Sequence, residues 1–599
     1  MRGQREPIFM RLPRNRPISF VPFFEEIRTY RFSFLKDDLL AAIAVALMTI
    51  PQSLAYSLLA GLPPTAGLFA AIFGTILTAS FGSSKQLVSG PSTGTAILLQ
   101  TSIATILYTY YPTVTGVERD ALLLHLLTQF VVIIALIQIG SSFFHVSKLL
   151  QFVSRPVVLG YFAGITVAIA VSQAFGFTGI AAPGRDLTIL NQGWYFFLHL
   201  SQTHLATFFV GAASLGLFLL FRKRLKNWPN GLLMLIGGTL IAEGLSMILG
   251  VSGIRTLGDF SLPMKPIPKF QFPLLDLDVI AKIFPSALAL AFLAILEVFS
   301  ISRAIAAKSG QRVSANQDVF GLGLGNIVLS CISGAMPASG SATRTTLNVN
   351  FRAKTRFAAI FSGLFTAAII LFCWPMVKHI PLAALAALLI VTVHALMDWK
   401  EIQFAVRATR ADAWVFFLTF FSCLLFTLDV AFFIGIVISI GHYLKRSSMP
   451  HLVEYAFNAK GRLMVVNPKE DVKRKVRIIG IGGDLYFATA DVFQSALETV
   501  ADDQHVRAIV LRLNNVYHMD ASMCLAILRL FETLKGAERH LVISGLTEEV
   551  WQGFLRAGIV KQIGLDNLYF ADESNPQFST WKACLRAQEL IHRHDISSI

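Results

Sequence analysis

Charged residues are scarce in this chain, at 15% of its 599 residues, whereas hydrophobic residues make up 54%. A single soluble core could not bury that much apolar surface, so the composition excludes an ordinary soluble globular protein. Apolar runs of about 20 residues, the length that crosses a bilayer, recur from about Leu39 to about Tyr443. The chain is therefore expected to be a polytopic membrane protein.

Cysteine is rare as well, and its spacing argues against two classes of site. The five cysteines have no CxxC spacing, which indicates neither a zinc site nor a disulfide framework. They are Cys331, Cys373, Cys423, Cys524 and Cys584. The glycine-rich stretch GIGGDL, Gly480–Leu485, lacks the GxGxxG spacing of a dinucleotide site. We expect no metal, no cofactor and no enzymatic activity.

The formal net charge of +15 invites comparison with nucleic-acid-binding proteins. The basic residues, however, lie in short segments beside apolar runs, and no basic face with interleaved aromatic residues occurs. We therefore expect no nucleic-acid partner. Residues 1–17 lack the apolar run and small-residue cleavage site of a secretory signal. Residues 1–36 are expected to form a cytoplasmic amino-terminal segment.

The lengths and punctuation of the apolar runs predict fourteen spans. They lie near residues 38–60, 64–81, 90–108, 121–140, 152–176, 204–222, 231–250, 281–300, 316–334, 340–351, 357–376, 382–397, 412–428 and 429–445. The third and the tenth look short or broken. Basic residues concentrate in alternate loops, among them Lys85, Lys148 and the run RKRLK at Arg222–Lys226. By the positive-inside rule, these loops and both termini face the cytoplasm.

The texture of the sequence changes beyond about Ser447, where acids and bases occur in every stretch. Strand-like runs such as VRIIGIGGDLYF alternate there with helix-like runs such as TADVFQSALETVA. This alternation predicts an α/β domain with a partly parallel sheet. We expect an amino-terminal segment over residues 1–36, a transmembrane domain over 37–446 and a cytoplasmic domain over 447–599.

Two predicted spans begin with small and hydroxyl-bearing residues, SGPSTGTAILL at Ser89–Leu99 and MPASGSATRTTL at Met336–Leu347. A helix that begins inside the membrane leaves N–H groups without partners unless they line a cavity. Pro91 and Pro337 suit helix starts, and the nearby glycines let a ligand approach the backbone. Two helix N-termini facing each other near the midplane would bind an anion. The alternative is that the small residues only permit tight helix packing.

Arg344 and Glu297 are ionisable residues inside predicted spans, where charges mark functional sites. Arg344 would supply a full positive charge to the anion; its alternative role is a salt bridge to an acid such as Glu297. A carboxyl group beside an anion site could gain and lose a proton and so couple anion movement to protons. Its alternative role is structural, as a partner for a helix N-terminus or for Arg344.

The stretch from Asp37 to Ser92 resembles the signature of the sulfate permease family of anion transporters. It follows the pattern D-x-x-A-x-x-x-A-x-x-x-I-P-Q-x-x-A-Y-x-x-L-A-x-L-P-P-x-x-G-L, with G-S-S-K and G-P farther on. HMDASMCLAILRLFETLKG, His518–Gly536, resembles the core turn of the STAS domain that follows these transporters. The resemblance implies two inverted seven-helix repeats, similar to uracil transporters, with a core domain that slides against a gate domain. It also implies a homodimer.

The same resemblance implies which residues form the site. The set is Gln52, Tyr56, Ser92, Thr93, Thr343 and Arg344 for the anion, and Glu297 for the proton. Sodium-coupled bicarbonate members of the family typically have Asp at this last position and a hydroxyl four residues on, where this chain has Glu297 and Ile301. The missing oxygen ligand favours protons over sodium. In the STAS domain, Ala521 occupies the position of a phosphorylatable serine, so we expect a folded module and no phosphorylation switch of that kind.

We therefore expect a secondary active transporter of the cell (inner) membrane that moves a small oxyanion, with sulfate favoured. Protons would accompany the anion inward through elevator-like displacement of the core domain. The expected partners are an inorganic anion, protons, the lipid bilayer and a second copy of the chain. The alternatives are a bicarbonate or dicarboxylate transporter, coupled to sodium or working by exchange, and an anion channel or a sensor of the same fold.

Overall fold

The structure is a computed structural model in which part of the chain is described. The described residues are 18–19, 22–144, 153–183, 188–225, 228–249, 253–259, 266–394, 397–447, 451–458, 460–466, 474–501, 503–572 and 574–597. Residues 1–17, Lys148 and Lys226, which entered the topology prediction, lie outside them. The chain divides into two compact units, Met1–Ser439 and Ile440–Ile599, each described by itself. The expected limits at residues 36 and 446 stay predictions.

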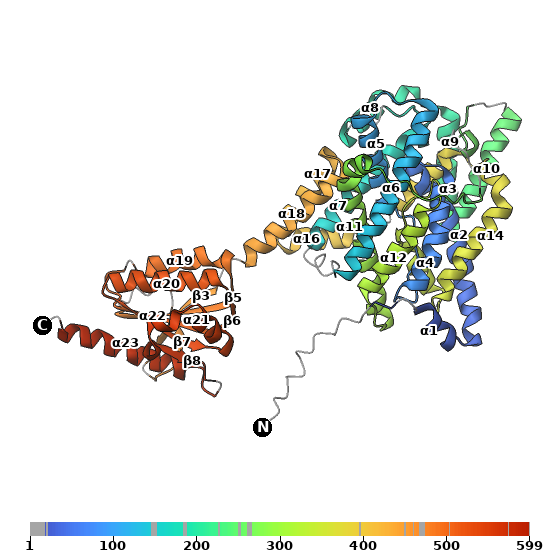
Figure 1. The fold of residues 1–599 in the computed structure, drawn as a ribbon. Coiled ribbons are helices and arrows are strands. Elements are labelled where there is room, and N and C mark those ends of the chain that lie inside the picture. The colour runs from blue at the N-terminus through green and yellow to red at the C-terminus, as the bar shows by residue number, and fades with distance from the viewer. Residues whose placement is uncertain are drawn as a thin grey trace. The chain divides into compact units, whose positions relative to one another are not determined.

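The first unit consists of helices that follow the predicted spans closely (Figure 1). Its first half contains α2 (Leu35–Leu59), α3 (Pro64–Phe69) continued by η3 (Ala70–Gly74) and α4 (Thr75–Phe81), α5 (Thr93–Tyr110), α6 (Gly116–Phe143), α7 (Arg155–Thr178), α9 (Leu205–Arg224) and α10 (Asn230–Leu249). Its second half contains α11 (Leu277–Ser309), α12 (Ala315–Ser330), α13 (Ala342–Asn350), α14 (Phe357–Val377), α15 (Leu382–His394) and α17 (Arg410–Leu425). The last helix, α18 (Leu428–Ser447), runs past Ser439.

Three further helices were not predicted as elements: α1 (Pro22–Thr29), α8 (Ile189–Leu198) and α16 (Trp399–Ala408). The helix α11 has 33 residues and is longer than the predicted span 281–300 at both ends. The side chain of Asp276 caps its first turn by accepting from the N–H groups of Asp278 and Val279. Gly310 ends the helix in the left-handed conformation, at φ 69°, which glycine adopts without steric cost.

Among the described residues, ten helices are long and apolar enough to cross a membrane. The helices α12 and α17, with 16 residues each, are shorter than that, and α13 has only nine. The count of fourteen crossings therefore stays a prediction. The short α13 agrees with the interruption that the sequence indicates for the tenth span.

The helices of the first unit pack in two groups. In the first group, α14 packs on α2 and α4, α12 on α4 and α6, α11 on α5 and α6, and α13 on α2. Figure 1 shows α2, α4 and α14 of this group side by side. In the second group, α15 packs on α7 and α9, α17 on α7, and α10 on α9. The two groups meet where α2 contacts α10 and α15, and where α5 contacts α7.

The two interrupted segments meet inside the first group. The two-residue strands β1 (Ser89–Gly90) and β2 (Ser339–Gly340) pair antiparallel, with Ser89 opposite Gly340 and Gly90 opposite Ser339. The helix α5 begins three residues after β1, and α13 begins two residues after β2. Pro91 directly precedes Ser92, the cap residue of α5, whereas Pro337 lies before β2 and four residues ahead of Ser341, the cap residue of α13.

The second unit is an α/β domain with a six-stranded sheet in the order β4-β3-β5-β6-β7-β8. The strands are β3 (His451–Phe457), β4 (Leu463–Val465), β5 (Val476–Leu485), β6 (Ala508–Met519), β7 (His540–Leu546) and β8 (Leu568–Phe570). The four strands β5 to β8 are parallel, and β3 is antiparallel to both of its neighbours. The partly parallel sheet that the sequence predicts is confirmed.

Alternating residues of the central strands build a core on each face of this sheet. Ile479, Leu511 and Ile543 pack with the helices of one face, which are α19 (Phe487–Ala501), α20 (Ala521–Gly536), α21 (Glu548–Arg556) and α22 (Ile559–Ile563). Their neighbours Ile478, Val510 and Val542 pack with α23 (Phe578–Ser597) on the other face. The stretch Gly480–Leu485 lies within β5, where it pairs with β6.

Candidate functional site

The N-termini of α5 and α13 lie beside the two-residue sheet. Ser92 caps α5, accepting from the N–H of Thr95 at 3.2 Å, while Thr95 Oγ1 accepts from the N–H of Ser92 at 3.3 Å. Ser341 is the cap residue of α13, but its side chain accepts no hydrogen bond from a backbone N–H of that helix. The start of α5 is buried, whereas at the start of α13 Ser341 and Arg344 are buried and Ala342 is exposed. Their free N–H groups and partial positive charges suit an anion.

Arg344, in the first turn of α13, is completely buried. Its Nη2 donates to the carbonyl oxygen of Pro91 at 2.6 Å, whereas its Nε and Nη1 have no hydrogen-bond partner among the residues that the structure describes. Leaving buried donors of a charged group unpaired is costly, so an anion that accepted from them would be bound strongly. Gly90 makes room for this side chain, because a Cβ at that position would lie 2.7 Å from Nη1.

Glu297 connects the two half-helix segments from α11. Its Oε1 accepts from the Ser92 hydroxyl at 3.2 Å, and its Oε2 accepts from the Ser339 hydroxyl. No ion pair joins Glu297 to Arg344, although the two groups interact electrostatically. The salt bridge that the sequence leaves open for Arg344 is therefore not formed. The carboxyl group bridges the start of α5 and the strand that precedes α13.

The predicted residues of α2 lie beside the same helix starts. Tyr56 is buried, and its hydroxyl lies near the Thr93 side chain. Gln52, one turn earlier, is also buried, and its Oε1 has no partner. Thr343 is half-buried, and its hydroxyl lies 3.5 Å from that of Ser341. Every side chain of the predicted set is carried by α2, α5, α11 or α13, or caps α5, and so belongs to the first helix group.

A cavity of about 900 Å³ lies next to these residues, between the two helix groups. Gln52 and Thr343 line it from the first group. From the second group come Leu388 and Thr392 of α15, the start of α10, and Arg222 near the end of α9. The cavity thus leads from the start of α13 to the end of α9, which holds part of the basic run Arg222–Lys226.

Ser339, which contacts Glu297, was missed by the sequence reasoning. The signal was present, since the dipeptide Ser-Gly occurs at Ser89–Gly90 and again at Ser339–Gly340, and these are the two paired strands. Asn326 of α12 was missed as well. Its side chain accepts from the Ala338 N–H at 2.8 Å and donates to the Ala338 carbonyl at 3.1 Å, which fixes the residue before Ser339.

Comparison with known proteins gives matches over most of the chain. Residues 35–419 match the model of the Sulfate permease family, and residues 464–571 match that of the STAS domain. The chain is 27% identical over 570 residues to Sulfate transporter 4.1, chloroplastic, of Arabidopsis thaliana, which covers 91% of this chain and 80% of that relative. It is 26% identical over 554 residues to Putative sulfate transporter YvdB of Bacillus subtilis (strain 168), which covers 91% and 98%.

A solved structure is similar over nearly the full length. The murine Solute Carrier 26 family member A9 anion transporter, in the inward-facing state, matches with a TM-score of 0.84 and 19% identity, covering 97% of both chains. At this identity the likeness shows the fold alone. The expected fold class, a helical membrane domain followed by an α/β STAS domain, is confirmed.

Proposed function

Because the chain belongs to the sulfate permease family of anion transporters, we propose that it is a secondary active transporter that moves sulfate together with protons. The relatives named sulfate transporters support the choice of anion. The observation that carries the proposal is the buried Arg344 guanidinium, which lies beside two helix N-termini. Two of its nitrogens have no hydrogen-bond partner in the described part of the chain.

The charges of the site suit a dianion that travels with a proton. Each helix N-terminus is equivalent to about half a positive charge. Together with Arg344, the starts of α5 and α13 offer about two positive charges, which match the two negative charges of sulfate. An ionised Glu297 beside them would cancel about one of these charges. Protonation of Glu297 therefore favours sulfate binding, and loss of that proton favours release.

Hydrogen bonds from the remaining residues would orient the anion. Tyr56, Ser92, Thr93 and Thr343 carry hydroxyl groups, and Gln52 carries an amide, on the surfaces that surround the two helix starts. Ser92 serves both ligands in this proposal, because its hydroxyl group donates to Glu297 while the oxygen of the same group accepts from the Thr95 N–H and so caps α5. A change of protonation at Glu297 thereby alters a hydroxyl at the edge of the anion site.

We propose an elevator-like mechanism, because the whole site belongs to the first helix group. If this group moves against the second, the anion, Arg344 and Glu297 travel together. The cavity of about 900 Å³ between the groups would be the inner vestibule, and Arg222 at its mouth would attract anions. In this assignment the transporter lies in the cell membrane, and both termini and the STAS domain are cytoplasmic. We also propose that the transporter is a homodimer.

The test is uptake of labelled sulfate into proteoliposomes, with an inward proton gradient present or absent and sodium omitted. The gradient should accelerate uptake by the parent protein and should have no effect on the Glu297→Gln variant, which cannot exchange the proton. Glu243→Gln is the matched control, because Glu243 lies on α10, is exposed and pairs with His379 outside the site. It should retain the gradient dependence of the parent.

Other outcomes separate the parts of the proposal. Sulfate uptake by the parent that ignores the gradient would overturn proton coupling and leave the substrate intact. If the parent transports no sulfate, the substrate assignment is wrong, and the same vesicles are then tested with bicarbonate plus sodium and with dicarboxylates. A gradient effect that persists in Glu297→Gln would remove Glu297 from its role.

A further inference from the structure

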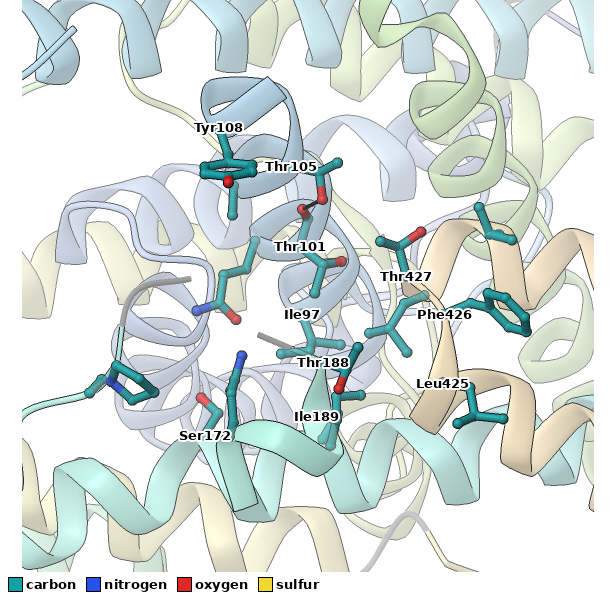
Figure 2. Close-up of a pocket in the computed structure, with 18 of the residues that line it drawn as sticks. Ile97, Thr101, Thr105, Tyr108, Ser172, Thr188, Ile189, Leu425, Phe426 and Thr427 are labelled. Carbon is teal, nitrogen blue, oxygen red and sulfur yellow. Dashed lines mark hydrogen bonds between the residues drawn. The ribbon is translucent and has the colours of Figure 1, made fainter. Parts of the chain in front are cut away.

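A second cavity, of about 560 Å³, lies mainly beside the C-terminal half of α5, and none of the predicted site residues line it. Gln100, Thr101 and Thr105 of α5 line one side of it, and Ser172 of α7 lines another. Figure 2 shows Thr101, Thr105 and Tyr108 above Ser172 and Ile189, with the connection from Leu425 to Thr427 closing one end. The lining therefore comes from both helix groups.

The chemistry of this lining differs from that of the anion site. Among the described residues, no Lys, Arg, His, Asp or Glu lines the cavity. Its polar groups are hydroxyls and amides, and the rest of the wall is apolar, with Ile97, Ala104, Ala168 and Phe175 among its members. A volume of about 300–1,000 Å³ with an apolar wall and a few hydrogen-bonding groups is typical of sites for small organic ligands.

Two of these polar groups form no hydrogen bond within the part of the chain that the structure describes. They are the side chains of Gln100, which is half-buried, and Thr427, which is exposed, and they come from opposite helix groups. The Thr105 hydroxyl, by contrast, donates to the Thr101 carbonyl of its own helix at 2.9 Å. An acyl tail of the bilayer could not satisfy an amide and a hydroxyl, so a purely apolar occupant fits this cavity poorly.

We propose that this cavity binds an uncharged amphiphile, with hydroxyl or ester groups that bond to Gln100 and Thr427 and a short apolar body that contacts Ile97 and Ala168. An anionic ligand would find no cation among the described residues that line it. The bound molecule would touch α5 from the first group and α7 and the α17–α18 connection from the second. It would hold the two groups together and slow transport.

The effect on transport rests on the proposed function, whereas binding does not, so binding is measured first and without a substrate. The full chain carrying Thr105→Cys is reconstituted in phosphatidylcholine vesicles and labelled with a maleimide, and the labelling of the parent is subtracted. The probe is monooctanoylglycerol. At ten times its dissociation constant it leaves about one-eleventh of the sites free, so labelling should slow about tenfold.

Matched variants separate binding from disturbance of the bilayer. Ala121→Cys is the control, because Ala121 is exposed, does not line the cavity and lies five residues from the α5–α6 connection, as Thr105 does. Its labelling should not change with the probe. Ala104→Phe or Ser172→Leu, each of which fills the cavity from a different helix, should abolish protection of Thr105→Cys. The use of two filling variants covers the case in which one does not fold.

Three results would overturn the proposal. They are equal slowing of both cysteines, protection that survives either filling variant, and equal protection by octanoate, which carries a negative charge.

Sulfate uptake is then measured with the probe present. We expect the maximal rate to fall and the KM for sulfate to stay constant, because the cavity is separate from the anion site. A rise in KM alone would show that the cavity belongs to the anion pathway. Binding without any change in uptake would overturn the proposed slowing of transport.

Discussion

The Nη2 of Arg344 and the carbonyl oxygen of Pro91, 253 positions apart in the chain, form a hydrogen bond of 2.6 Å. Pro91 precedes the cap residue of α5, and Arg344 lies in the first turn of α13. The bond therefore ties the two half-helix starts together through a charged side chain. Since it occupies only one nitrogen, the guanidinium is held in place while Nε and Nη1 remain available.

Replacement of Arg344 by lysine should keep the positive charge and lose the planar arrangement of hydrogen-bond donors. A lysine ammonium is a point charge and cannot bond to Pro91 and present two further nitrogens in one plane. Loss of one charge-assisted hydrogen bond of about 1.5–3 kcal/mol corresponds to about a 10- to 100-fold loss of affinity. We expect the KM for sulfate in proteoliposomes to rise by that factor. Arg407→Lys, at an exposed position of α16, is the control, and an unchanged KM in Arg344→Lys would contradict the assignment.

Gly90→Ala should abolish sulfate uptake without removing the protein from the membrane. The new Cβ would lie 2.7 Å from Nη1 of Arg344 and 3.1 Å from Cα of Ala71, and the backbone there has a φ of 139°, which disfavours any side chain. Both effects displace the guanidinium. Gly216→Ala is the control, because a Cβ at Gly216 meets nothing within 4 Å. Uptake by Gly90→Ala equal to that of the control would show that Arg344 has more freedom than its contacts indicate.

Local sequence patterns predicted most of the helices of the first unit, because long apolar runs directly indicate membrane-crossing helices. They also indicated the half-helices, since proline, glycine and hydroxyl residues are unusual at the start of an apolar run. What they could not give was the pairing across the chain. The contact of Ser339 with Glu297 and that of Arg344 with Pro91 depend on how β1 meets β2. No spacing within either segment encodes that meeting.

The predicted helix limits were wrong where short polar signals determine the helix ends. The cap at Asp276 and the left-handed Gly310 set the ends of α11, yet both lie outside the apolar run that predicted the span. The helix α1 was missed because its polar residues pair with distant parts of the chain, Glu26 with both Lys85 and Arg356. Glu26, buried on α1, pairs with the buried Arg356 at 3.0 Å, and 330 positions separate the two residues.

Asn326→Ala should destabilise the site through Ala338, the residue that precedes Ser339. It would leave the N–H and C=O of Ala338 unpaired in a buried place, and each such group costs about 1–3 kcal/mol. We expect a lower melting temperature for the purified protein and weaker proton dependence of uptake, because the next residue, Ser339, donates to Glu297. Asn191→Ala, at an exposed position of α8, should change neither quantity. A lower melting temperature with normal proton dependence would restrict Asn326 to a purely structural role.

Cys584 in the STAS domain should resist thiol reagents until the solution is strongly alkaline. Burial raises the pKa of its thiol from 9.0 to about 12. At pH 9 the folded chain would carry about one thiolate in a thousand at this position, against about half in the unfolded chain, so maleimide labelling should be about 500-fold slower before unfolding. Because the folded pKa is the higher one, the thiol favours folding fully below pH 9, and this contribution falls as the pH rises towards 12.

Mass spectrometry of the Cys584 peptide, with and without urea, measures the ratio of the two labelling rates. Ser495→Cys, exposed on α19, should label quickly in both states, and equal rates at Cys584 in the two states would show that α23 does not bury the thiol in solution.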